Sequence, residues 1–304
     1  MKNFSPEHKI ALLDERSPKA LALLDDCTVC PRECHVNRKA GETTGICGVD
    51  ARLKISSANL HFGEEPPISG TKGSGTIFLS GCNLRCVFCQ NYPISQFRHG
   101  EIVTIDEAAS MMLQLEKRGA HNINFVTPSH YVPQLMAAML AAYKQDLSLP
   151  IVYNSSGYDK LETLQLLDGI IDIYMPDMRY SRAESAHCYS SARDYPEINR
   201  IAIKEMHRQV GELIIDDDEI AVQGLLVRHL VLPDNIAGSR EIFEFLAKEI
   251  SPETYVSLMS QYFPAHKAVN LEKLNRRILA EEYQAALDAF ERAGLSNGFL
   301  QPYL

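Results

Sequence analysis

The sequence lacks the features on which nucleic-acid-binding, membrane-spanning and exported proteins depend. Its 30 Lys and Arg residues are outnumbered by 39 Asp and Glu residues, which gives a net charge of −9. It has no long basic run and no basic patch interleaved with aromatic residues, so we expect no nucleic-acid partner. The charged N-terminus has no apolar signal-peptide core, and no stretch approaches about eighteen consecutive apolar residues. We therefore expect a cytoplasmic protein that does not cross a membrane.

Internal repeats and low-complexity tracts are also absent, and the length favours one catalytic domain with a small appendage. A chain of 304 residues buries roughly three-quarters of its unfolded surface, so its core needs no disulfides. Seven of the eight cysteines lie between Cys27 and Cys89. In a large chain without an export signal, this clustering indicates metal sites. Cys188 stands alone in a polar stretch, and we expect it to be an incidental thiol.

Three cysteines within eight residues, Cys82, Cys86 and Cys89, form the most informative motif. Thiolates at this spacing can hold three irons of a [4Fe-4S] cluster, whereas an electron-transfer cluster of this type uses a fourth Cys ligand. The local motif supplies none, and an iron without a protein ligand can act on a bound molecule. A zinc knuckle is the alternative. It is disfavoured because structural zinc is four-coordinate and closed, and because the strand-like residues 75–81 precede the loop.

A second cysteine group precedes this motif and consists of Cys27, Cys30, Cys34 and Cys47. Four thiolates on two arms can close a tetrahedral zinc site, which is our first choice from the sequence. They can equally satisfy an auxiliary iron-sulfur cluster, and unmetallated thiols are the third alternative. A metal would contribute on the order of 10 kcal/mol to folding a segment that is too polar to fold alone. We expect this group to be a scaffold.

The segment between the two cysteine groups, residues 61–76, is rich in Gly and Pro and is predicted to be a surface loop. It contains His61, Glu64 and Glu65. These residues are either acid or base groups near the site or part of a solvated turn, and the sequence leaves both interpretations open.

From residue 75 onward, apolar runs rich in β-formers alternate with amphipathic helical segments, as in parallel βα units. Strands are predicted at 76–80, 122–126, 151–154, 170–175, 225–232 and 255–259. Helices are predicted from a capping box at Thr104 to about Arg118, and at 132–143, 159–167, 197–210 and 239–248, the last capped by Ser239. Residues 270–293 are predicted to form one terminal helix capped by Asn270. Residues 194–208 and the acidic 216–219 are expected to form a peripheral insertion.

Six parallel units predict an α/β protein with an incomplete (β/α)6 barrel. Its expected parts are a Cys-rich N-terminal extension at 1–72, the partial barrel at 73–265 and a C-terminal helix at 266–304. Ligands of such folds bind at the carboxyl ends of the strands, so candidate site residues are sought there.

The run SGCNLRCVFCQN at 80–91 resembles the signature of the radical S-adenosylmethionine (radical SAM) superfamily. Within it, the chain is similar to the pyruvate formate-lyase activating enzymes. It looks closest to activase-related proteins that carry both CxxCPRxC and HFGEEPPISG, and the resemblance covers residues 27 to about 265. It implies the same partial barrel and an oxidoreductase with a [4Fe-4S] cluster on Cys82, Cys86 and Cys89.

By this resemblance, the open iron chelates SAM. One electron then cleaves SAM to methionine and a 5′-deoxyadenosyl radical, which abstracts hydrogen from a substrate. The resemblance also implies flavodoxin or ferredoxin as the electron donor and a glycyl radical enzyme as one candidate protein substrate.

The resemblance also assigns roles in SAM binding. Phe88, before the last cysteine, would lie against the adenine, with core packing as the alternative. After the second predicted strand, a Gly-Gly-Glu-like turn usually accepts hydrogen bonds from the SAM ammonium group. This chain has Asn124 to His130 there, without a carboxylate, so the Thr127 hydroxyl and backbone carbonyls would replace it.

The later strand ends supply the other predicted SAM contacts. Asn154 and Ser156 would reach the ribose or the carboxylate, and Asp177 would bind ribose hydroxyls. Arg179 stands where a lysine is usual. Arg228 lies in an apolar strand and needs an anion, which is either the SAM carboxylate or a structural carboxylate. His229 is expected on the opposite face. Gln261 and Tyr262 are expected to line the mouth.

Three functions remain open from the sequence. A glycyl radical activase must admit a peptide loop, so its barrel mouth must be open. The long N-terminal cysteine segment could cap that mouth, which favours a radical SAM enzyme that modifies a small molecule or a protein side chain. A non-catalytic iron-sulfur sensor is the third alternative.

Overall fold

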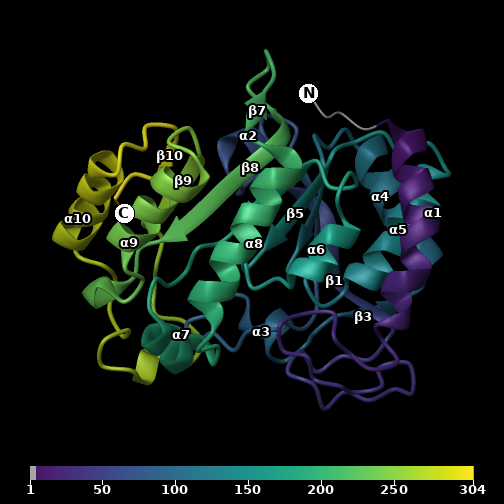
Figure 1. Cartoon of the computed structure of the whole chain (residues 1–304), viewed down its shortest axis with the longest axis horizontal. Coiled ribbons are helices and arrows are strands. Elements are labelled where there is room, and N and C mark those ends of the chain that lie inside the picture. Colours follow the sequence, from purple (N-terminus) through teal and green to yellow (C-terminus); the bar gives the residue numbers. More distant parts are fainter. Residues whose placement is uncertain (1–4, 304) are drawn as a thin grey trace.

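The computed structural model describes residues 5–303 and contains ten strands in that part of the chain (Figure 1). They are β1 Leu53–His61, β2 Ser74–Leu79, β3 Glu101–Val103, β4 Ile123–Val126, β5 Ile151–Ser155, β6 Ile173–Pro176, β7 Ile214–Ile215, β8 Ala221–Leu230, β9 Tyr255–Met259 and β10 Gly298–Leu300.

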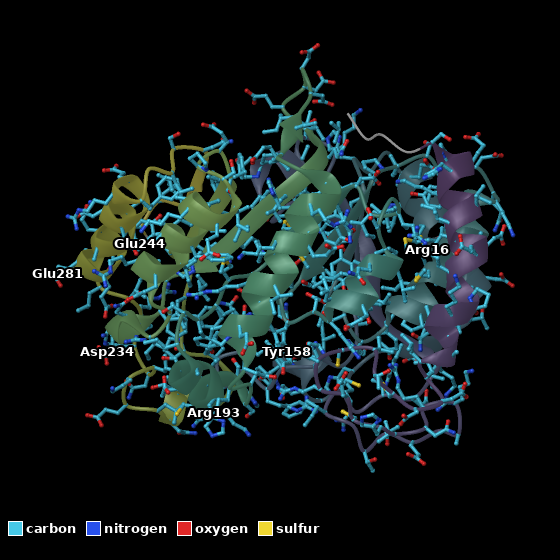
Figure 2. All side chains as sticks on the ribbon, viewed as in Figure 1. Arg16, Tyr158, Arg193, Asp234, Glu244 and Glu281 are labelled. Atoms are coloured by element: carbon cyan, nitrogen blue, oxygen red, sulfur yellow. The ribbon has the colours of Figure 1, made fainter. Side chains whose placement is uncertain are left out.

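The α-helices of the described residues are α1 Pro6–Ala22, α2 Pro66–Ser69, α3 Tyr92–Ser95, α4 Ile105–Lys117, α5 Val132–Tyr143, α6 Leu161–Leu166, α7 Ala183–Ser190, α8 Tyr195–Val210, α9 Ser239–Phe245 and α10 Ala280–Arg292. Short 3-10 turns span Pro233–Asn235 and His266–Asn270, and a π-helical turn spans Leu246–Ile250. Arg16 on α1 and Glu281 on α10 lie toward opposite ends of the molecule (Figure 2).

A mostly parallel sheet runs through the middle of the fold, in the order β10-β9-β8-β6-β5-β4-β2-β1-β3 with β7 paired to β8. The neighbouring pairs from β2 to β10 are parallel. β1 is antiparallel to both β2 and β3. The α/β class and the six predicted parallel strands, now β2, β4, β5, β6, β8 and β9, are confirmed. Their carboxyl ends lie along one edge of the sheet, where the site residues gather.

Two predicted helices have the expected form. α5 has the predicted bounds, and α4 begins with the predicted capping box, in which Thr104 and Glu107 bond each other's backbone N–H groups. The α1 helix had no counterpart among the predicted elements. It packs against α5 and begins at the cap residue Ser5, whose hydroxyl accepts a hydrogen bond from the His8 N–H. Apolar periodicity did not predict this helix, because its sequence is rich in charged residues and contains Pro18.

The predicted terminal helix over residues 270–293 is wrong, because α10 begins only at Ala280. The preceding segment is held by other contacts. The Tyr262 hydroxyl donates to the Leu274 carbonyl at 2.7 Å, and Arg276 pairs with both Asp234 and Glu282 at 2.8 Å. These tertiary contacts determine the backbone here in place of local helical bonds.

Two smaller predictions also fail. Ser239 does not cap α9: the cap position is Gly238, and the Ser239 hydroxyl lies 2.9 Å from Nε2 of His229. Residues 194–208 are not a peripheral insertion, because α8 packs against α6, β6 and β8. Only the acidic residues 216–219 project, at the tip of the β7–β8 hairpin (Figure 1).

The predicted loop before β2 contains structure that positions the site. β1 pairs with β2 from His61 opposite Ser74 onward, and α2 follows β1. Ile68 of α2 is fully buried against residues of several strands, including Val152 of β5 and Ile173 of β6. The chain just before α2, which carries Glu64, is thereby held against the interior of the sheet.

Candidate active site

The three-cysteine loop follows β2 directly, and each of its sulfurs has a hydrogen-bond donor nearby. The Leu84 N–H donates to the sulfur of Cys82 at 3.4 Å. The Ser190 hydroxyl donates to the sulfur of Cys86 at 2.9 Å. The sulfur of Cys89 lies 3.1 Å from the hydroxyl of Ser95.

These sulfurs suit a metal-bound form. Burial raises the pKa of Cys82 to about 12, and burial also raises the pKa of Cys89. Without a metal, both therefore stay protonated at neutral pH, and a bound cation is what would make them thiolates. Arg179 adds a positive charge 3.6 Å from the sulfur of Cys86. Hydrogen bonds and cations around the sulfurs are the surroundings that an anionic thiolate cluster requires, so the loop fits a [4Fe-4S] cluster.

The sulfurs do not meet at one point. Within residues 5–303, no group of three or more His, Cys, Asp or Glu side chains has the geometry that holds a single metal ion.

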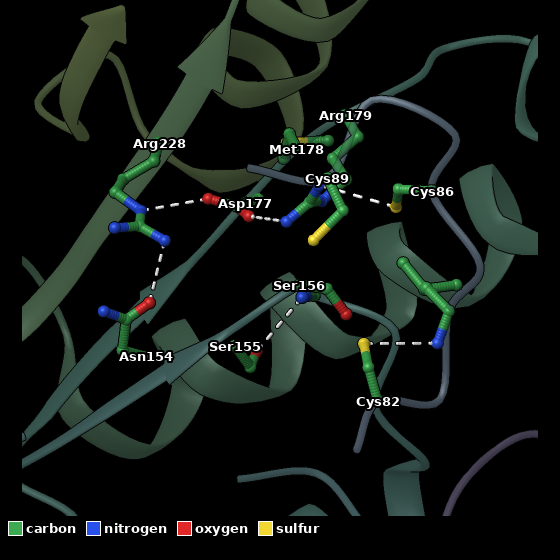
Figure 3. A network of polar contacts seen from close by, with 12 residues as sticks. Cys82, Cys86, Cys89, Asn154, Ser155, Ser156, Asp177, Met178, Arg179 and Arg228 are labelled. Carbon is green, nitrogen blue, oxygen red and sulfur yellow. Dashed lines mark hydrogen bonds and ion pairs between the residues drawn. The ribbon is translucent and has the colours of Figure 1, made fainter. Parts of the chain in front are cut away.

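A row of charged side chains leads from the three-cysteine loop across the strand ends (Figure 3). Nε of Arg228 on β8 donates to Oδ1 of Asp177, at the end of β6, at 2.9 Å. The other carboxylate oxygen of Asp177 pairs with Arg179, which faces Cys86. On its other side, Arg228 donates from Nη2 to Oδ1 of Asn154 at 2.8 Å. Four of the predicted SAM-binding residues therefore form one network.

Glu64 extends this network from a segment that the sequence left undecided. Its carboxylate lies 3.4 Å from Nη1 of Arg228 and 3.5 Å from Nδ2 of Asn154. Burial raises the pKa of Glu64 to about 7, although the neighbouring Arg228 acts to lower it. Of the other two residues in this segment, Glu65 is buried with one unpaired carboxylate oxygen, and His61 packs edge-on against Phe78. Glu64, and not His61, is the titratable group in contact with the network.

An open cavity of about 200 Å³ lies between the three-cysteine loop and the ends of β6, β8 and β9. Asp177, Arg179 and Arg228 lie on one wall. The other lining residues are Phe88, Cys89, Gln90, Asn91, Leu230, Leu232, Met259 and Gln261. Gln261 is therefore among the lining residues, whereas Tyr262 is buried.

Phe88 makes the core contacts of its alternative role and also lies at the cavity wall. It lines the cavity, and its ring also packs edge-on against Tyr180 and Tyr262, with centroids 6.4 and 5.9 Å apart. Core contacts hold the ring in place at the cavity wall, where its contact with adenine remains a prediction.

Asn124 lies in β4, Thr127 directly follows β4, and Ser156 directly follows β5. None of the three lines this cavity. Thr127 has a φ of 62°, which is uncommon for a β-branched residue, and its N–H donates to the Asn154 carbonyl at 2.8 Å. The Ser156 hydroxyl is buried without a hydrogen-bond partner. A buried unpaired hydroxyl at a strand end is suited to a ligand, as expected for a SAM site. The roles of these three residues stay predictions.

His229 points away from the network, as strand alternation predicted. It is fully buried, with Nδ1 2.7 Å from the Met178 carbonyl, and burial lowers its pKa to about 4. In contrast, the sequence did not predict that the hydroxyls of Ser95 and Ser190 contact the sulfurs of Cys89 and Cys86. No local signal could identify Ser190, because it lies 104 residues beyond Cys86, and only the packing of α7 brings them together.

The four N-terminal cysteines, Cys27, Cys30, Cys34 and Cys47, line a second, more enclosed cavity. The predicted gathering of this group is therefore present. Cys188 is exposed and lines neither cavity.

None of the helices within residues 5–303 is both long enough and apolar enough to cross a bilayer.

Comparison with known proteins agrees with this site. The family model of the radical SAM superfamily matches residues 76–177, which run from β2 through the three-cysteine loop to Asp177. The uncharacterized protein MJ0674 of Methanocaldococcus jannaschii is 31% identical over 291 residues, which cover 93% of this chain and 80% of that protein. The uncharacterized protein MJ0808 of the same organism is 24% identical over 275 residues, covering 82% of this chain and 74% of that protein.

The matched family consists of enzymes that use a [4Fe-4S] cluster and SAM. Its model matches the part of the chain in which the cysteine loop and the charged network meet, and the first relative extends the similarity along most of the sequence. This chain belongs to the radical SAM superfamily.

Proposed function

We propose that this chain abstracts hydrogen from its substrate as a radical SAM enzyme of the activating type, with a backbone glycine of a partner enzyme as the first candidate substrate. When bound, the cluster would supply the electron that cleaves SAM into methionine and a 5′-deoxyadenosyl radical. A low-potential one-electron donor such as flavodoxin or ferredoxin would reduce it.

The observation that carries this proposal is the position of the cavity relative to the N-terminal cysteine segment. The cavity lies against Cys89 and Phe88 and is bounded by the ends of β6, β8 and β9. No residue from 27 to 47 is among those that line it. The segment that could have capped the mouth lies elsewhere, which supports access for a peptide loop from outside.

The charged network supports the binding of SAM. Arg228 donates hydrogen bonds from Nε to Asp177 and from Nη2 to Asn154, whereas its Nη1 makes only the 3.4 Å contact with Glu64. That nitrogen is the available donor for a carboxylate of the ligand. Asp177 holds both Arg228 and Arg179 in place, so the two guanidinium groups stay at the cavity wall.

A small-molecule substrate is the second candidate. The cavity volume of about 200 Å³ lies below the range of about 300–1,000 Å³ that is usual for small-ligand sites. Leu230, Leu232 and Met259 make part of its wall apolar. A compact substrate with an apolar side would fit these features.

The test uses anaerobically reconstituted, reduced protein incubated with SAM. We expect 5′-deoxyadenosine from the wild type and from Cys188→Ala, and none from Cys86→Ala. If the wild type forms no more 5′-deoxyadenosine than Cys86→Ala does, both candidate functions are refuted.

The second step separates the two substrates. Co-expression with glycyl radical enzymes is expected to give a glycyl-type doublet in electron paramagnetic resonance with one of them. If SAM is cleaved but no candidate partner gives the doublet, the small-molecule alternative is favoured.

A further inference from the structure

We propose that Cys27, Cys30, Cys34 and Cys47 bind a second iron-sulfur cluster, which packs against the back of the three-cysteine loop. This inference does not depend on which substrate the active site takes.

Local backbone contacts hold the four cysteines around one cavity. The Cys27 N–H donates to the Val36 carbonyl at 3.0 Å, and the His35 N–H donates back to the Cys27 carbonyl at 3.1 Å. A Cβ on Gly45 would lie 3.3 Å from the sulfur of Cys34, so the second arm approaches this cysteine closely only because residue 45 is glycine. The cavity is formed by ordered turns whose cysteines all face it.

A buried arginine lies at this cavity. Arg38 lines the cavity and is 1% exposed. Its guanidinium donates to the carbonyls of His130 at 2.6 Å and Asp50 at 3.0 Å, and it lies 5.6 Å from the ring centre of Tyr131. Among residues 5–303 it forms no ion pair with a carboxylate. A buried guanidinium is costly without a counter-charge, and a metal centre held by four thiolates carries net negative charge.

Two further arginines repeat this pattern on the side that faces the three-cysteine loop. Arg32 donates to the carbonyls of Asn83 at 2.8 Å and Ser191 at 2.7 Å. Arg85 donates to the Ile46 carbonyl and contacts the Gln96 side-chain carbonyl at 3.4 Å. In the part of the chain that the structure describes, neither pairs with a carboxylate. Three arginines thus lie around the cysteine group, and none of them forms an ion pair with a carboxylate among residues 5–303, although Arg38 contributes to lowering the pKa of the nearby Asp50.

The same contacts join the two cysteine groups directly. Asn83 and Arg85 lie within the three-cysteine loop, and Ile46 precedes Cys47. A Cβ on Gly81 would lie 2.9 Å from the Cys47 carbonyl, so the two segments touch through their backbones immediately before Cys82. Filling the N-terminal cavity would therefore also fix the three-cysteine loop.

The arrangement favours a cluster over zinc. Four thiolates on one zinc ion each lie about 2.3 Å from it, so their sulfurs must converge on a point. In this structure the four cysteines instead stand around a cavity. A cluster distributes its four thiolates over four irons, which suits ligands that surround a space.

The test is metal and sulfide analysis of full-length protein purified anaerobically. A Cys82/Cys86/Cys89→Ala variant is expected to keep about four irons and four sulfides per chain. Adding Cys47→Ser should reduce both to background, whereas adding Cys188→Ala should leave them unchanged. Zinc in place of iron, or no bound metal in a folded variant, would overturn the inference.

Arg38 provides a readout that depends on its charge. In the triple-alanine background, Arg38→Met is expected to release iron to a chelator about 10-fold faster, and Arg38→Lys is expected to restore most of the retention. Equal release from both variants would show that the charge of Arg38 does not hold the cluster.

If the triple-alanine variant fails to fold, the wild type still decides the question. Reduced wild-type protein is expected to hold about eight irons and to give two paramagnetic signals, of which only one changes when SAM is added. About four irons and a single signal would overturn the inference. A failure to cleave SAM would leave the iron count unchanged, so the two proposals fail separately.

Discussion

Arg228 and Asp177 meet at the ends of two neighbouring parallel strands, with Nε of the arginine 2.9 Å from Oδ1 of the carboxylate. Asp177 also pairs with Arg179, whose guanidinium faces the sulfur of Cys86. One carboxylate therefore holds two partly buried guanidinium groups and joins the strand ends to the three-cysteine loop (Figure 3). Burial acts to lower the pKa of Arg228, but Asp177 and the neighbouring Glu64 and Glu65 raise it, so the group stays charged.

Asp177→Asn is therefore expected to lower both the stability of the protein and its affinity for SAM. It leaves two partly buried cations without their shared anion. Breaking a fully buried pair costs about 3–5 kcal/mol, and we expect a loss toward the lower end of this range. We expect a lower melting temperature and at least about 30-fold weaker SAM binding, measured by calorimetry on the anaerobic protein. Asp168→Asn is the matched control, because Asp168 pairs with Arg208 at the surface and should cost no more than about 1 kcal/mol. Similar losses in both variants would contradict the role of the Asp177 network.

Ser190→Ala is expected to lower the reduction potential of the SAM-responsive cluster. The Ser190 hydroxyl donates to the sulfur of Cys86 at 2.9 Å, and hydrogen bonds to cluster sulfurs favour the reduced, more negative state. A bond of about 1 kcal/mol corresponds to a shift of roughly 40 mV for one electron. The measurement is a redox titration followed by electron paramagnetic resonance. Ser191→Ala, at the exposed neighbour, should leave the potential unchanged, and a shift of equal size there would refute the contact's role.

The raised pKa of Glu64 predicts that the stability of the folded protein depends on pH. The folded protein keeps the Glu64 proton up to about pH 7, because burial raises its pKa, whereas the unfolded chain loses it near 4.5. Between these values the folded state binds more protons, so the contribution of Glu64 to stability falls as pH rises, by roughly 3 kcal/mol in total. We expect the melting temperature of Glu64→Gln to change less between pH 4.5 and 7 than that of the wild type. Glu244→Gln, on the exposed face of α9, should keep the wild-type slope, and a steep slope in Glu64→Gln would exclude this assignment.

The structure also indicates which parts of the fold and site local sequence could predict. The strands and α5 follow from apolar periodicity, and the Cys82 loop and Asp177 follow from motif spacing and strand ends. Glu64 could not be placed, because its burial depends on the contact of Ile68 in α2 with the starts of β5 and β6. The residues before α10 were predicted as helix because the pairing of Arg276 with Asp234 is a long-range contact that periodicity does not encode.

Lys9 provides a test of the α1 helix, which the periodicity argument missed. Its ammonium group lies 2.7 Å from Oδ1 of Asp172 and 3.1 Å from the hydroxyl of Tyr143, and both charged side chains are less than a tenth exposed. The other oxygen of Asp172 accepts a hydrogen bond from the Ile151 N–H at the start of β5. The Lys9–Asp172 ion pair therefore holds α1 against the amino end of the sheet.

Lys9→Met leaves the Asp172 charge buried and unpaired, and we expect it to lower the free energy of unfolding by about 3–5 kcal/mol in chemical denaturation. The double variant Lys9→Met/Asp172→Asn should recover part of this loss, because the amide removes the buried charge and can still accept the Ile151 N–H. Lys19→Met is the control, since Lys19 pairs with Glu15 on the exposed face of the same helix and should cost less than about 0.5 kcal/mol. A Lys9→Met effect as small as that of Lys19→Met would mean that the buried pair does not hold α1 against the sheet.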